Sequence, residues 1–196
     1  MAQTNNNLEA AVKLHVHNTA LSAAFWGPLQ VFEIALRNAF HGQLSGHFGA
    51  TWYDEAAFLM DQDIIKNIDD VKQKLADKHL AIDTPHIVAE LQFGFWTLLT
   101  SGRYEHTIWT PALSKAFAQY AATHGKAPKR STISGQLTYI RGFRNRIAHH
   151  EPIFHRDLLA DYKSLLSLSS WLAAGLDDWM EYHSRVRYLL PRRELY

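Results

Sequence analysis

The stretch "GPLQVFEIALRNAFHGQLSGHFG", residues 27–49, places apolar residues three and four positions apart, so that they share one face of a helix. Pro28 opens this run and glycines close it, which is the usual punctuation of a helix. The 196-residue chain shows no sustained alternation of apolar and polar residues of the kind that a half-buried strand needs. We therefore predict an all-α protein.

Similar periodicity on both sides of this stretch predicts the other helices. The predicted segments are 8–24, the run from Pro28, 61–79, a buried helix from Pro85 with Thr84 as N-cap, one from Pro111, one from Ser131 or Thr132 to about His150, and one or two between Asp157 and Tyr188. Residues 123–132, "THGKAPKRST", form the one clear loop. The chain contains neither a repeat nor a linker, so we predict a single domain over residues 1–196.

Composition limits the classes of protein to consider. A domain of this length buries about 70% of the surface that its unfolded chain exposes, so a full hydrophobic core is expected. The chain has no cysteine, which excludes disulfides, thiolate metal sites and cysteine nucleophiles. The N-terminus lacks the features of a signal peptide, and no run of 18 apolar residues occurs. We expect a soluble, cytoplasmic protein that does not enter a membrane.

Charge is distributed unevenly along the chain although the net charge is only +1. No acidic residue lies between Glu105 and Glu151, whereas the rest of the chain is acidic. The cations of this basic segment are Lys115, Lys126, Lys129, Arg130, Arg141, Arg144 and Arg146. The segment is either a phosphate-facing surface or a solvated face that pairs with the acidic stretch 54–90.

The stretch "GFRNRIAHHEPIF", residues 142–154, gathers arginine, asparagine and two adjacent histidines just before a proline. On a helix Asn145 and His149 are four residues apart and share a face, whereas Arg144 and His149 are about 140° apart around the axis. Arginine has a long reach and the helix ends here, so both side chains can converge on one phosphate.

These residue types have complementary chemistry. A guanidinium holds two phosphate oxygens, and histidine can take or give a proton near neutral pH. Together they can cleave an RNA backbone without a metal ion, by activating the ribose 2′-OH and stabilising the phosphorane. Alternatively, Arg141, Arg144 and Arg146 are ordinary surface residues, and the histidines interact with the dipole of the helix end.

The segment "RNRIAHHEP", residues 144–152, resembles the signature of the Abi-like (abortive infection) proteins, a branch of the HEPN superfamily. That signature is an arginine, usually a polar residue after it, and a histidine after four to six residues. "FEIALRNAF" (32–40) and "ELQFGFWTLL" (90–99) are similar to two further blocks of that family, in the expected order.

The resemblance implies a HEPN-type helical bundle with additional helices, a homodimer, and metal-independent endoribonuclease activity in phage defence or toxin systems. It implies that Arg144 and His149 are the catalytic pair and Asn145 their polar neighbour. His150 also fits the allowed spacing, so either histidine can be the catalytic one. No cofactor is implied, and an antitoxin or other protein partner is compatible with this class.

Other cations are predicted to hold the RNA. The predicted RNA-binding residues are Arg141, Arg146, Lys126, Lys129, Arg130, Arg37 and Asn38. Arg37 and Asn38 either line the RNA groove or hold the motif helix, with Glu33 in support. Alternatively, Glu33 and Arg37 pair with each other at their four-residue spacing.

Two alternatives differ in class from a ribonuclease. A zinc site built from "HHEPIFH" fails because the residue four after His150 is Phe154 and Pro152 breaks the helix, so we predict no metal site. The more serious alternative is a non-catalytic HEPN-type dimer that binds RNA or a protein partner. For either dimer, the tryptophan-containing C-terminal helices or the segment 40–48 are the candidate contact surfaces. Trp96 is predicted to belong to the core.

Overall fold

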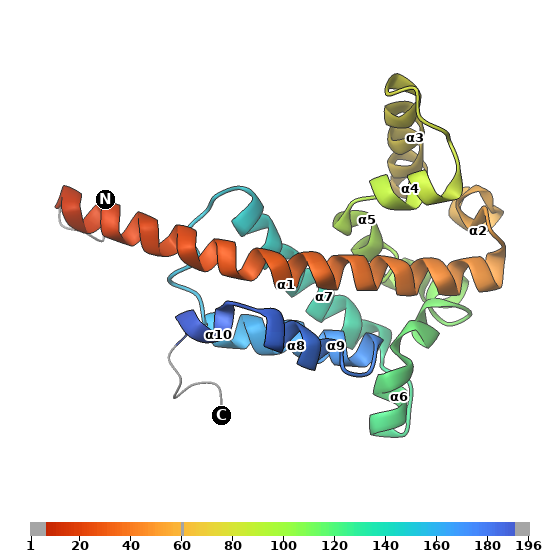
Figure 1. The fold of residues 1–196 in the computed structure, drawn as a ribbon. Helices are drawn as coiled ribbons and strands as arrows, with labels where there is room; N and C mark the ends of the chain where they lie inside the picture. Colours follow the sequence, from red (N-terminus) through yellow and green to blue (C-terminus); the bar gives the residue numbers. More distant parts are fainter. Residues whose placement is uncertain (1–6, 60, 191–196) are drawn as a thin grey trace.

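The computed structural model describes residues 7–59 and 61–190, and within these ranges it contains helices and no strand. The predicted all-α class is confirmed. The longest helix, α1 (Leu8–Phe48), runs the length of the molecule, and the other helices gather around it (Figure 1). They are α2 (Ala56–Leu59), α3 (Gln62–Asp77), α4 (Thr84–Glu90), α5 (Phe93–Leu98), α6 (Ala118–His124), α7 (Arg130–Ala148), α8 (Leu158–Leu172), α9 (Leu176–His183) and α10 (Val186–Leu189).

Helix α1 is a single helix, whereas the sequence predicted a break before Pro28. Proline inside a helix removes one backbone hydrogen bond and costs about 3 kcal/mol. Here Pro28 is itself buried, and Phe25, Leu29 and Phe32 bury their side chains on either side of it. Each of these apolar side chains contributes about 1.5–3 kcal/mol by its burial, which outweighs the lost hydrogen bond. The prediction of two helices was therefore wrong.

Helices α1, α7 and α8 meet in the centre of the core. The ring of Phe25 packs edge-on against Phe143 of α7 and Tyr162 of α8, with centroid distances of 4.9 and 5.9 Å. Such edge-to-face pairs add about 0.5–1.5 kcal/mol to the area that they bury. The buried apolar side chains from Leu21 to Leu190 form one connected cluster. The candidate site at the end of α7 therefore rests on the central packing of the protein.

The predicted helix from Pro85 is divided into α4 and α5. The chain becomes extended at Leu91 and Gln92, where ψ is 124° and 162°. The indole Nε1–H of Trp96 donates to the freed Leu91 carbonyl at 3.3 Å, and Trp96 is fully buried as predicted. The N-cap is Asp83, which accepts from the amide of His86. The predicted cap, Thr84, was wrong: its hydroxyl donates to the carbonyl of Ala50.

Three other boundaries differ from the predictions. Pro111 lies in a turn between a π-helical turn, Glu105–Trp109, and a 3₁₀ turn, Leu113–Phe117, so the α-helix begins only at Ala118. Further 3₁₀ turns lie at Trp52–Asp54 and Gly102–Tyr104. Helix α7 begins at Arg130 rather than after Ser131 or Thr132, and the C-terminal part contains three helices instead of one or two.

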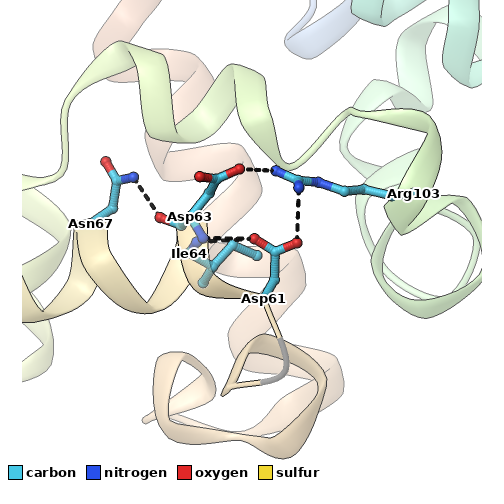
Figure 2. Close-up of polar contacts among 5 residues, drawn as sticks. All are labelled: Asp61, Asp63, Ile64, Asn67 and Arg103. Carbon is cyan, nitrogen blue, oxygen red and sulfur yellow. Dashed lines mark hydrogen bonds and ion pairs between the residues drawn. The ribbon is translucent and has the colours of Figure 1, made fainter.

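Helix α3 agrees with the prediction for 61–79. Its N-cap, Asp61, accepts hydrogen bonds from the amides of Asp63 and Ile64. Arg103 bridges the Asp61 and Asp63 carboxylates at 3.1 and 2.7 Å, and Asn67 donates to the Asp63 carbonyl (Figure 2). The cluster fastens the start of α3 to the chain that follows α5.

Candidate functional site

The C-terminal end of α7 holds both histidines of the motif. His149 is the C-cap, and His150 follows with a φ of 58°, in the left-handed region. The amide of Glu151 donates to the Arg146 carbonyl at 2.8 Å, and that of His150 donates to the Ile147 carbonyl at 3.1 Å. These two bonds make a Schellman motif, whose left-handed residue is usually glycine. Both histidine side chains are exposed to solvent.

Arg144 lies one turn earlier and faces α1. Its Nε is 3.5 Å from a carboxylate oxygen of Glu33, and both side chains are partly exposed. The two residues share a groove of about 320 Å³ that runs along α1. It is lined by Trp26, Leu29, Gln30, Glu33, Ile34, Arg37 and Arg144. The groove therefore offers two guanidinium groups, a carboxylate and an apolar wall, open to solvent.

Glu33 and Arg37 do not form the pair with each other that the sequence left open. Glu33 pairs with Arg144, and Arg37 Nη1 donates to the Ala89 carbonyl of α4 at 3.2 Å. Arg37 Nε is buried and has no hydrogen-bond partner within the described part of the chain. Arg37 thus joins α1 to α4 and also lines the groove. Asn38 is exposed and is not among the residues that line it.

The other polar residues of the motif have separate positions. Asn145 is exposed, and its carbonyl accepts from the amide of His149. Arg141 turns toward α5 and donates to the Thr97 hydroxyl at 3.2 Å. Arg146 donates twice to the Pro152 carbonyl and pairs with Glu151 at 3.1 Å, which fixes the loop after α7. Arg141 and Arg146 are therefore occupied by contacts with α5 and with the loop after α7.

The predicted RNA-binding residues at the start of α7 are distant from Arg144. Fourteen residues of helix separate Arg130 from Arg144, which is about 21 Å at 1.5 Å per residue. Arg130 pairs with Glu105 at 3.0 Å and donates to the Thr100 carbonyl at 2.8 Å, whereas Lys126 and Lys129 are exposed. The structure does not bring this group together with the histidines.

The basic segment does not pair with the acidic stretch 54–90 in the described ranges. Its ion pairs are formed by Arg130, Arg144 and Arg146 with Glu105, Glu33 and Glu151. The acidic stretch pairs instead with nearby cations, which are Lys72, Lys74, Lys78, His86 and Arg103. That alternative interpretation of the charge pattern was wrong.

Sequence reasoning missed Asn18, which anchors the loop after the histidines. Its side chain is buried in α1, and its Oδ1 accepts from the amide of Ile153 at 2.7 Å. The sequence contained one signal of this role, because Asn18 is a polar residue that lies one turn before Leu21 on the apolar face of α1. Trp26 and Gln30 were also missed, because nothing local in the sequence places them beside Arg144.

Two further findings concern ligands and surfaces. Within residues 7–59 and 61–190, no three His, Asp or Glu side chains are grouped so that they could hold a metal ion, and no helix is long and apolar enough to cross a membrane. Phe40 and Leu44 are fully buried and Phe48 packs against Phe58, so these apolar side chains of segment 40–48 belong to the core, while Gly42, Gly46 and His47 are exposed. Trp179 of α9 is exposed.

The fold and the site together define an all-α protein with an arginine and histidine site at the end of one central helix. The sequence matches the family of Abi-like proteins over residues 1–155. The chain therefore belongs to the Abi-like protein family. Neither the curated proteins nor the solved structures include a significant match.

Proposed function

We propose that this Abi-like protein is a HEPN-type, metal-independent endoribonuclease that acts in phage defence or as a toxin. The observation that carries the proposal is the arrangement at the end of α7. There Arg144 lines an open groove with Arg37, and His149 and His150 are exposed one turn further on. Membership of the Abi-like family supports a role in abortive infection.

The reaction needs a base, an acid and a cation, which two copies of this site supply. A histidine, His149 in our assignment, takes the proton of the ribose 2′-OH, and the 2′ oxygen attacks the adjacent phosphorus. The bond from phosphorus to the 5′ oxygen breaks, and that oxygen receives a proton from a second histidine. Arg144 stabilises the negative charge of the phosphorane. The products are a 2′,3′-cyclic phosphate and a 5′-hydroxyl.

A homodimer supplies the second histidine. One protomer contributes one Arg144 and one His149, whereas the reaction uses a base and an acid on opposite sides of the phosphate. A two-fold contact brings both copies of each residue into one cleft. Like charges on the two α7 helices oppose this contact without RNA, so apolar surfaces must hold the dimer.

The test is to incubate the purified protein with cellular RNA, with and without EDTA, and to map the ends produced. We expect cyclic phosphate and 5′-hydroxyl ends in both conditions. Arg144→Ala and His149→Ala should each reduce the rate about 10²- to 10⁴-fold with little change in thermal stability. His155→Ala is the matched control, because His155 is exposed but lies outside the motif. Activity that disappears in EDTA and returns with Mg²⁺ would refute the mechanism.

The same experiment separates the non-catalytic alternative. If the protein binds RNA or another protein without cutting RNA, wild type and both variants will give identical RNA profiles. The structural role of the motif would then be visible as a small fall in the thermal midpoint of Arg144→Ala, because this variant loses its partly exposed contact with Glu33.

A further inference from the structure

The N-terminal end of α1 projects beyond the rest of the molecule (Figure 1). No side chain of residues 8–16 is buried, and the first buried residue of the helix is Asn18. Leu8, Val12 and Val16 are each at least 53% exposed. A helical end of this length is marginally stable in water without packing, so its apolar residues indicate a surface that contacts another molecule.

These residues belong to a longer stripe along α1. At 100° per residue, Leu8, Val12 and Val16 fall within about 80° of Trp26 and Ile34, which are 45% and 40% exposed. Exposed and uncharged residues fill the positions between them. We call this set the α1 stripe: Leu8, Val12, Val16, Thr19, Ala23, Trp26, Gln30 and Ile34. From Leu14 to Phe32 the helix carries no Asp, Glu, Lys or Arg, although half of its surface faces solvent.

The α1 stripe has the same spacing when read from either end. Its steps are four, four, three, four, three, four and four residues, and their midpoint is residue 21. We propose that two copies of this chain pair through their α1 stripes, antiparallel, with the two-fold axis beside residue 21. The residue numbers of two facing positions then add up to 42. Val16 of one copy therefore faces Trp26 of the other, and Leu8 faces Ile34. Thr19 and Ala23 are small and let the helices approach at the axis.

The surface that receives the projecting end has the required shape. In this register residues 8–16 of one copy lie along residues 26–34 of the other. There α1 forms a ridge between two hollows, and Gln30 borders both. One hollow is the groove of Arg144. The other, of about 190 Å³, is lined by Gly27, Pro28, Gln30, Val31, Trp179, Met180, His183 and Ser184.

The projected area of the contact is about half of what a standard interface buries on each partner. Residues 8–34 span about 40 Å of helix, and a strip about 10 Å wide covers on the order of 400 Å² per protomer in projection. Side-chain relief and the walls beside Trp26 and Trp179 increase this area toward the roughly 800 Å² that each partner of a standard interface buries. No charged residue of α1 lies on the stripe, so no like charges oppose each other along it.

The pairing also explains how two motifs could share a cleft, and this part rests on the proposed function. Asn18, which holds the loop after His150 through Ile153, is only about 4.5 Å along the helix from residue 21. A two-fold axis perpendicular to the paired helices carries both α7 helices to the same side. The two loops that follow the histidines therefore flank the axis.

The first test compares Val12→Glu with Ala10→Glu by light scattering, on protein freed of RNA. Both variants add one carboxylate to the projecting end, but Ala10 lies about 160° around the helix from Val12. We expect wild type and Ala10→Glu to have twice the 22.4 kDa chain mass, and Val12→Glu to be a monomer with unchanged helical circular dichroism. A monomeric wild type, or a Val12→Glu variant that remains a dimer, would overturn the proposal.

The second test determines the register of the two helices. The chain has no cysteine, so any disulfide must come from the introduced residues. Val12→Cys and Gln30→Cys are made and purified separately. Within a dimer of either single variant, the two cysteines are about 27 Å apart along the helices and should not form a disulfide. An equimolar mixture should give a covalent dimer on oxidation, in up to about half of the pairs. Covalent dimers of Val12→Cys alone would indicate parallel helices and refute the register.

These tests also separate the two proposals. A dimeric wild-type protein that does not cut RNA would leave the pairing intact and refute the ribonuclease. Full cleavage by monomeric Val12→Glu would refute the role of this pairing and the two-protomer site, and would leave only the ribonuclease activity itself intact.

Discussion

Replacing His150 with glycine should stabilise the protein. A side chain in the left-handed region costs about 1–2 kcal/mol, and His150 has a φ of 58°. Glycine removes this cost, but it adds about 0.5–1 kcal/mol of backbone entropy to the unfolded chain. The net gain is about 0.5–1 kcal/mol. In a chain of this length we expect the thermal midpoint to rise by about 1–4 °C. Thermal unfolding followed by circular dichroism measures it.

The chain contains a matched control for this substitution. His79 has a φ of 55° at the end of α3, where its amide donates to Ala76 and the next amide donates to Leu75 in the same Schellman pattern. His79→Gly should therefore give a similar rise. Because His149 is our assigned base, RNA cleavage should survive in both glycine variants. If neither variant raises the midpoint, the reasoning from backbone strain is refuted. If His150→Gly alone abolishes cleavage, His150 is the catalytic histidine.

Four further predictions concern residues elsewhere in the chain. Burial lowers the pKa of His41, so this histidine binds a proton more readily in the unfolded chain than in the folded protein. Stability should therefore decline as the pH falls below about 6.5. His41→Gln should make the thermal midpoint less dependent on pH. Asp161→Ala should lower the unfolding free energy by on the order of 3 kcal/mol in urea titrations. The reason is that the buried Asp161 carboxylate pairs with Arg156, which would be left without its partner. Arg130→Ala should lower it by about 1–3 kcal/mol, whereas replacing Lys126 and Lys129 with Ala should keep stability and reduce the salt dependence of RNA binding.

Local periodicity in the sequence predicted most of the helices correctly. Helices α3 and α7 bury residues at regular spacings, and that pattern is visible without any partner. The two main errors depend on side-chain contacts that helical periodicity does not encode. Helix α1 continues through Pro28 because of the core around it, and α4 is separated from α5 where Trp96 satisfies the Leu91 carbonyl. A local pattern contains no record of either contact.

The candidate site was predicted in part for the same reason. The motif lies within one short segment, so its position at a helix end could be predicted for Arg144, His149 and His150 from the sequence. The partners of these residues come from α1, which is far away in the chain. The pairing of Glu33 with Arg144 and the anchoring of the loop by Asn18 appear only after α1 and α7 have packed together.

The match to the Abi-like family ends at residue 155, but the packed core does not. Helix α8 begins at Leu158, and its Tyr162 covers Phe25 in the centre of the molecule. A chain shortened to residues 1–155 would uncover this aromatic contact and leave α1 and α7 with an open apolar side. The boundary recognised by comparison of sequences is therefore not a boundary of folding. Any shortened version of the protein that is made for expression should keep α8.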